Sequence, residues 1–164
     1  MNYDALLTGK HFMDGMDLWT VYSLFVEGGS DDFLKYAAAK EGISHDWTDA
    51  HGVDVDLSRR FLAGRNISLK CGMLVASEAE FWLKYEALLN HLMKPEKRRI
   101  EVAEFGDRSF YVYYKDVSSL GRFTKIKDSD LIGIKFTLNL VENEPQLDNT
   151  NTFIVDETGR FLIT

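Results

Sequence analysis

The chain has 164 residues, of which 45% are apolar and 13% aromatic, and its formal net charge is -7. This length fits one domain with a sizeable core, and the apolar content excludes a disordered tail or linker. Because binding to nucleic acids depends on clustered Lys and Arg, the acidic balance argues against specific nucleic-acid binding.

The first third of the chain has the least regular pattern. Residues 17–27 are apolar on both faces, which predicts a strand that is buried on two sides or shared with a neighbouring chain. Residues 31–40 are a short helix candidate that Gly42 would end. Residues 43–65 are rich in Asp, Gly and His and predict an extended surface loop.

A clear alternation of apolar and polar residues begins at Ile67. It continues to Val75 and predicts a half-buried strand. Ser77 and Glu80 then form a capping box, and apolar residues recur at helical spacing, so we expect one α-helix over residues 77–94. Its apolar stripe, which we expect to seal one side of the sheet, consists of Phe81, Trp82, Tyr85, Leu88, Leu89, Leu92 and Met93.

After the helix the period of the pattern returns to two. Residues 99–105 and 109–114 predict a β-hairpin around a Gly106-Asp107 turn, and residues 131–141 predict a long strand with one apolar face. Because most of these strands have one polar face, the sheet should be antiparallel. The expected fold class is α+β, mainly antiparallel β, with one packed α-helix.

We expect one domain over residues 1–144, followed by a tether and a small C-terminal β-hairpin over residues 145–164. Two strands alone are marginal in water, so this hairpin should pack on the same domain or on a neighbouring subunit. The N-terminus has no signal-peptide pattern, and no apolar run is long enough to span a bilayer. We therefore expect a protein that is made in a cytoplasm and does not contact a membrane.

The best candidate for a ligand site is a run of imidazoles and carboxylates in the predicted loop, since both are metal ligands. Its members are His45, Asp46, Asp49, His51, Asp54 and Asp56. Their spacing fits no standard metal site, and Asp is common in loops because its side chain caps turns. We therefore expect these Asp side chains to cap turns of the loop. The alternative is that the six residues make a metal-dependent binding module.

The motifs of common catalytic sites are missing from the sequence. No GxSxG or SxxK nucleophile, CxxC pair or phosphate-binding glycine loop is present. The single cysteine, Cys71, lies on the alternating segment, where a small buried hydrophobe is expected. We expect a protein that is not an enzyme and has no catalytic residue and no cofactor.

A loose pattern links the loop to the strand that follows it. It consists of His45-Asp46-Trp47, Gly52-Val53-Asp54-Val55-Asp56-Leu57-Ser58, Phe61 and Arg65-Asn66-Ile67-Ser68-Leu69. Together with the later strand, capped helix and strands, this stretch of about residues 42–144 resembles the amino-terminal domain of phage distal tail proteins. The resemblance implies a tail-tube-like β-sandwich or small barrel with a helix on its flank.

The resemblance further implies a structural, non-enzymatic phage or prophage tail protein that forms a homo-oligomeric ring, with a hexamer expected. Such a ring would contact other tail proteins and let DNA pass without binding it; it would be assembled in the host cytoplasm and end in the virion tail. Many family members have a second, carbohydrate-binding-like domain, whereas only a short hairpin follows Glu144 here. The interface candidates are Trp19, Tyr22, Phe25, Trp47, Phe153, Ile154, Phe161 and Ile163.

Overall fold

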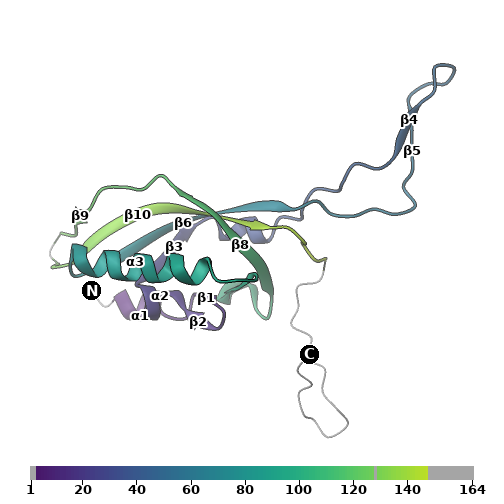
Figure 1. The fold of residues 1–164 in the computed structure, drawn as a ribbon. Helices are drawn as coiled ribbons and strands as arrows, with labels where there is room; N and C mark the ends of the chain where they lie inside the picture. The colour runs from purple at the N-terminus through teal and green to yellow at the C-terminus, as the bar shows by residue number, and fades with distance from the viewer. Residues whose placement is uncertain (1–2, 128, 148–164) are drawn as a thin grey trace, which may run out of the picture.

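Antiparallel strands make up most of the regular secondary structure, and one long helix packs against them (Figure 1), which confirms the α+β class. The computed structural model describes residues 3–127 and 129–147, and the predicted terminal hairpin lies outside them. The helices are α1 (Tyr3–Leu7), α2 (Leu18–Tyr22) and α3 (Glu78–Leu92), with 3₁₀ turns η1 (Ser30–Phe33) and η2 (Ala103–Phe105). The strands are β1 (His11–Met13), β2 (Met16–Asp17), β3 (Leu24–Gly28), β4 (Ser44–Asp46), β5 (Val53–Val55), β6 (Arg65–Val75), β7 (Arg98–Val102), β8 (Ser109–Ser118), β9 (Thr124–Lys125) and β10 (Ile132–Glu142).

Eight of these strands form one antiparallel sheet in the order β2-β1-β7-β8-β10-β6-β3, with β9 paired to β10. The longest pairing joins β6 to β10, from Val75 opposite Ile132 to Arg65 opposite Glu142. The two long strands predicted from alternation are therefore confirmed. The hairpin predicted after the helix is β7 with β8, although β8 extends to Ser118.

The sheet curves so that its two ends approach each other. His11 of β1 and Ser30 beside β3 lie at opposite ends of the strand order, yet the His11 Nε2 atom is 2.9 Å from the Ser30 hydroxyl oxygen. The apolar faces of β6 and β10 point into the space that this curve encloses. That core includes Ile67 and Leu69 of β6, and Cys71 there is 1% exposed. Burial raises the pKa of the Cys71 thiol to about 12, so this thiol is protonated at neutral pH.

Helix α3 begins where the capping box predicts. The Ser77 hydroxyl accepts a hydrogen bond from the Glu80 amide at 3.2 Å, and the Glu80 carboxylate accepts one from the Ala76 amide at 2.9 Å. The helix ends at Leu92, two residues before the predicted end at Lys94. Both ends of this element were therefore predictable to within a turn from local sequence.

The buried face of α3 is narrower than the predicted stripe. It consists of Phe81, Tyr85, Leu88, His91 and Leu92. Trp82 is 44% exposed because it lies about 100° around the helix from Phe81, away from the sheet. Met93, 66% exposed, is the C-cap residue that follows the last helical residue, Leu92. His91 was not predicted, and its burial depends on a polar partner from another part of the chain.

The strand predicted over residues 17–27 is wrong in its first half. The Asp17 carboxylate accepts hydrogen bonds from the amides of Trp19 (2.9 Å) and Thr20 (3.4 Å) and so caps the short helix α2. Ser23, with φ at 52°, then turns the chain into β3. The segment carries many apolar residues because Leu18 and Tyr22 of its helix and Leu24 of its strand are buried in the core.

The helix predicted over residues 31–40 is also wrong, since only the 3₁₀ turn η1 forms there. The Arg65 guanidinium donates to the carbonyls of Asp32 (3.2 Å), Phe33 (3.1 Å) and Lys35, which occupies acceptors that a helix would need. Gly29 before the turn has φ at 92°, and a Cβ there would lie 2.0 Å from the Ser68 carbonyl oxygen. The backbone at Gly29 therefore lies against β6 in a position that leaves no room for a side chain.

A substitution of Leu88, on the buried face of α3, tests whether this helix packs on the sheet. Leu88 is 1% exposed, so Leu88→Ala should lower the free energy of unfolding by about 2 to 5 kcal/mol, measured by urea denaturation. The matched control Leu83→Ala removes an equal side chain that is 69% exposed and should change stability by less than about 0.5 kcal/mol. Equal effects of the two substitutions would contradict this packing.

Candidate assembly interface

A projecting arm, residues 40–61, leaves the body between η1 and β6. Figure 1 shows it extending away from the sheet, with β4 and β5 paired near its tip. His45 lies opposite Asp54 in this hairpin, and Gly52 has φ at 82° in the turn that joins its strands. Every residue of the arm is exposed, so the predicted surface loop is outside the core but contains a hairpin.

The arm presents large apolar side chains to solvent. They are Ile43 (82% exposed), Phe61 (64%), Leu57 (62%), Val53 (56%), Trp47 (52%) and Val55 (42%). A two-stranded hairpin is marginal in water by itself, and contiguous exposed apolar surface is typical of interaction sites. The arm therefore has the composition of an element that packs on another surface.

The arm is also acidic. Between Glu41 and Asp56 the sequence contains five carboxylates and neither Lys nor Arg. Within the described residues none of these carboxylates forms an ion pair. Hydrogen bonds from the Ser58 hydroxyl and amide lower the pKa of Asp56, which keeps this carboxylate ionised. The outer part of the arm thus combines apolar side chains with unpaired negative charge.

The predicted metal-ligand types all lie on this arm. They are His45, Asp46, Asp49, His51, Asp54 and Asp56, and all are exposed. The His45 ring packs on the Trp47 ring with 3.9 Å between centroids. Within the described residues no three His, Cys, Asp or Glu side chains come close enough to hold a metal ion. The metal-binding alternative therefore has no geometry that supports it.

The base of the arm, in contrast, is fastened to the body. Arg65 at the start of β6 forms an ion pair with Glu142 at 2.5 Å, and the Glu142 side chain is 2% exposed. Backbone hydrogen bonds join the two sides of the base, from the Lys40 amide to the Phe61 carbonyl at 2.7 Å and from the Ala63 amide to the Ala38 carbonyl at 2.8 Å. The arm is therefore held at one end and free at the other.

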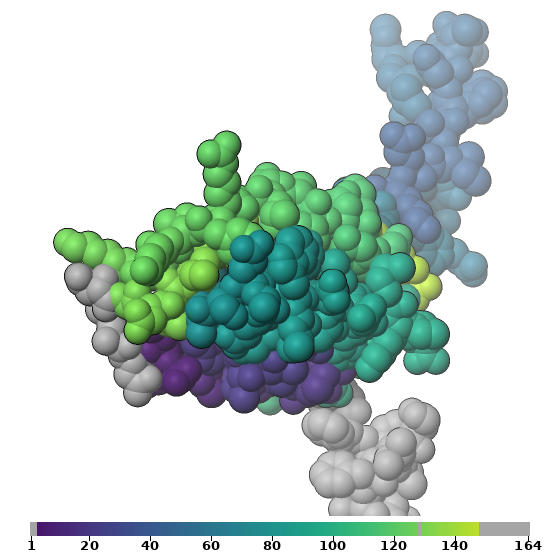
Figure 2. All heavy atoms as spheres, turned by 60° about the vertical axis from the view of Figure 1, so that its left-hand side comes forward, coloured from purple at the N-terminus to yellow at the C-terminus, as the bar shows by residue number. Residues whose placement is uncertain are grey.

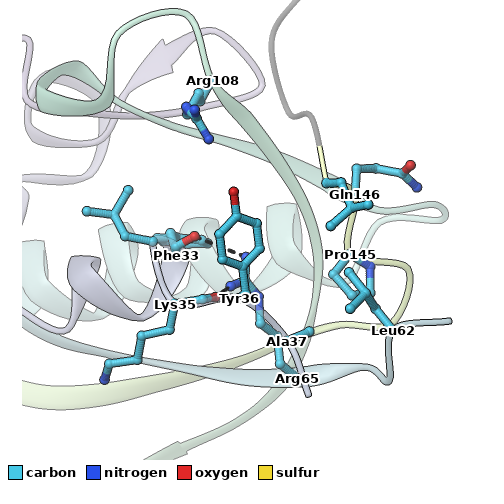
Figure 3. A pocket seen from close by; sticks show the side chains of 11 residues that line it. Phe33, Lys35, Tyr36, Ala37, Leu62, Arg65, Arg108, Pro145 and Gln146 are labelled. Carbon is cyan, nitrogen blue, oxygen red and sulfur yellow. Dashed lines mark hydrogen bonds between the residues drawn. The ribbon is translucent and has the colours of Figure 1, made fainter. Parts of the chain in front are cut away.

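A small hollow lies beside this base. Phe33, Tyr36, Arg65 and Arg108 are among the residues that line it (Figure 3). The Arg65 guanidinium there is already committed to Glu142 and to the carbonyls of the η1 segment. We therefore interpret the hollow as part of the anchor of the arm.

Two of the remaining interface candidates, Trp19 and Phe25, are half-buried, and their rings meet edge to face with 6.5 Å between centroids. Tyr22 is 5% exposed, and its hydroxyl lies 2.7 Å from the His91 Nδ1 atom, so the structure places Tyr22 in the core. Trp47 is on the arm. The last four candidates, Phe153, Ile154, Phe161 and Ile163, lie outside the described residues.

A polar cluster that sequence reasoning missed joins the β1–β2 turn to the end of α3. The Asp14 carboxylate lies 2.8 Å from His91 Nε2 and accepts hydrogen bonds from the Arg98 guanidinium at 3.0 Å and the Arg99 amide at 2.9 Å. Burial opposes ionisation of Asp14, but the Arg99 and His91 hydrogen bonds and the Arg98 charge outweigh it and lower its pKa. This cluster explains why His91 and Arg98 are buried.

Comparison with known proteins identifies the fold. No family model and no curated protein sequence matches the chain. Among solved structures, the chain is similar to the SPP1 Dit (gp 19.1) protein, described as a paradigm of hub adsorption apparatus in phages that infect Gram-positive bacteria. The TM-score is 0.60 at 18% sequence identity, over 83% of this chain and 50% of that chain.

The chain therefore shares the fold of a phage tail protein and spans half the length of that solved chain. The resemblance seen in the sequence is supported at the level of the fold. None of the described helices is long and apolar enough to cross a membrane.

The buried ion pair at the base of the arm gives a stability prediction. Glu142→Gln leaves the Arg65 charge without its partner, so we expect a loss of about 3 kcal/mol in the free energy of unfolding, measured by urea denaturation. The control Glu144→Gln changes a carboxylate that is 67% exposed and pairs with Lys97, and should cost less than about 1 kcal/mol. A loss no larger than that of the control would show that the pair does not hold the base.

The Asp14 cluster gives a pH prediction. Since the folded-state pKa of Asp14 lies below its ordinary value of 3.8, its contribution to stability is present above that pH and is lost as pH falls through the folded value. The Tm of wild type should therefore fall more steeply than that of Asp14→Asn as pH decreases below about 4, followed by circular dichroism. Asp49→Asn on the exposed arm is the control and should follow wild type; a parallel decline of all three would contradict the role of Asp14.

Proposed function

We propose that this protein is a structural, non-enzymatic subunit of a phage or prophage tail that forms a distal-tail or tube-like ring. The observation that supports it most is the projecting arm, whose large apolar side chains are left exposed by the described part of the chain. The fold is shared with a phage tail protein, and we propose that copies of this chain lie side by side in such a tail. The arm then packs on the neighbouring subunit.

The proposed ring requires that each copy passes its arm to the next copy and not back to the same partner. The arm leaves one end of the body (Figure 1), and we propose that it packs on a different part of the neighbour. Contacts between two different surfaces generate closed rings or open filaments, whereas a two-fold dimer joins the same surface twice. We propose a hexamer as the closed state.

The proposed ring contacts other tail proteins above and below it and is assembled in the host cytoplasm before it becomes part of the virion tail. DNA passes through it without specific binding. The net charge of -7 supports this, because an acidic wall repels phosphates instead of holding them.

Electron microscopy of the purified protein at high concentration tests the ring. We expect closed rings of six copies for wild type and monomers for Val53→Ser with Val55→Ser, which removes apolar surface from the arm without touching the core. The control Leu83→Ser changes an exposed apolar residue of α3 and should leave the rings intact. Wild-type protein that forms no rings in micrographs and stays monomeric in light scattering would overturn the proposal.

A further inference from the structure

A hollow beside β9 lies on the outer face of the sheet, which is the face turned away from the core. Its volume is about 350 Å³, and its lining includes the half-buried side chains of Phe25, Leu74 and Ile126. Glycine lets these side chains lie close to the sheet: a Cβ on Gly72 would lie 2.4 Å from the Phe25 ring, and one on Gly133 would lie 3.0 Å from Ile126. We call this apolar surface the outer hollow.

Between the outer hollow and the base of the arm, the same face of the sheet is polar. Alternate residues of a strand face the same side, so Ser68 and Lys70 of β6 share the outer face with Leu74. The Ser68 hydroxyl donates a hydrogen bond to the Asn139 side chain of β10 at 2.8 Å, and the Asn139 amide donates one to Asp116 of β8 at 2.6 Å. An apolar segment that crosses this face therefore meets an apolar surface at the outer hollow.

One cation on the rim of the outer hollow has no carboxylate beside it. Arg122 lines the hollow and is exposed, and it forms no ion pair within the described part of the chain. Lys135 lines the hollow too, but it is paired with Glu27 at 2.8 Å. The outer hollow therefore suits an apolar segment that carries a carboxylate next to it.

The arm of the same chain leaves the outer hollow uncovered. Figure 1 shows the arm leaving the body at the end opposite to β9, and Figure 2 shows it standing clear of the body. The chain that follows β10 starts from the end of the arm, since Leu147 lines the small hollow at its base together with Tyr36 and Arg65. A segment after Leu147 reaches the outer hollow by running back along the sheet.

The sequence after Leu147 has the pattern that such a path requires. Residues 148–152 are polar (Asp-Asn-Thr-Asn-Thr), residues 153–155 are apolar (Phe-Ile-Val), and the carboxylates of Asp156 and Glu157 follow. The order matches the surface beneath the path, which is polar first, then apolar, and then carries a cation on its rim.

The length of this segment matches the path as well. Arg65, at the base of the arm, and Gly72, beneath Phe25, are seven residues apart in β6, which is about 23 Å at the rise of a strand. The eight residues from 148 to 155 span up to about 28 Å when extended. Residues 153–155 can therefore reach the outer hollow of their own chain.

We propose that residues 148–157 form a strap that crosses the polar part of the outer face and places residues 153–155 in the outer hollow of the same chain. Asp156 and Glu157 then lie beside Arg122 and supply the negative charge that its surroundings lack. The strap removes from water an apolar surface that the described part of the chain leaves exposed. It is a contact within one chain and does not depend on the proposed ring.

Disulfide trapping in the full-length chain tests the strap. The test variant is Thr124→Cys with Thr152→Cys, because Thr124 is exposed and lines the outer hollow, and Thr152 directly precedes the apolar residues of the strap. Oxidised glutathione at low protein concentration should link the two cysteines within one chain, and mass spectrometry of the unreduced digest identifies the linked peptides. The native Cys71 is 1% exposed and should stay unlinked.

Matched controls separate a bound strap from a chain that meets the surface by chance. Thr20→Cys with Thr152→Cys puts the partner cysteine at an exposed position of α2 that does not line the hollow, and should link at least about fivefold less. Ile154→Asp in the test variant puts a charge into the apolar hollow and should also lower linking at least about fivefold. Thr150→Asp adds the same charge equally far from the cysteine, in the polar part of the strap, and should leave linking unchanged.

Each result decides for or against the strap. Linked monomers that depend on Ile154 would establish it. Linked dimers in place of linked monomers would place the segment on a second copy and overturn it. Absence of linking, equal linking at Thr124 and Thr20, or linking that Ile154→Asp does not lower would overturn it too. Rings in micrographs of wild type decide the ring proposal separately.

Discussion

The ion pair between Arg65 and Glu142 lies where the body of the fold meets the arm. It closes the far end of the β6–β10 pairing, and the same guanidinium holds the carbonyls of the η1 segment. One side chain thus joins three segments that are distant in the sequence. A buried carboxylate and several turn carbonyls depend on it, because each would otherwise lose a hydrogen-bond partner away from water. The position from which the arm leaves the body depends on this arrangement.

The body and the arm obtain their stability in different ways. The body encloses one core between the curved sheet and α3, and the Asp14 cluster ties the end of that helix to the β1–β2 turn. The arm has no core of its own, only a short hairpin with apolar and acidic side chains. Stability and the proposed assembly therefore use different parts of the chain: α3 packs on the core, and the exposed apolar surface proposed for a neighbour lies on the arm.

Sequence reasoning succeeded where the structure is governed by local periodicity. The alternation from Ile67 to Val75 and the capping box at Ser77 each specify an element from neighbouring residues, and both are confirmed. It failed over residues 17–27 and 31–40, where Asp17 caps a short helix and Arg65 takes the carbonyl groups of the turn. The Asp17 cap could have been read from the sequence, because Asp before an apolar run is a common helix start. The Arg65 contacts could not.

The candidate interface, too, could be predicted from the sequence only in part. The sequence determined that the segment around Trp47 is polar, acidic and on the surface, and it pointed to a tail-protein fold that the structural similarity supports. Only the tertiary structure decided that this segment is an arm and that Tyr22 belongs to the core. The reason is physical: periodicity and caps act between residues a few positions apart, whereas the curvature of a sheet and the direction of an arm depend on contacts between residues that only folding brings together.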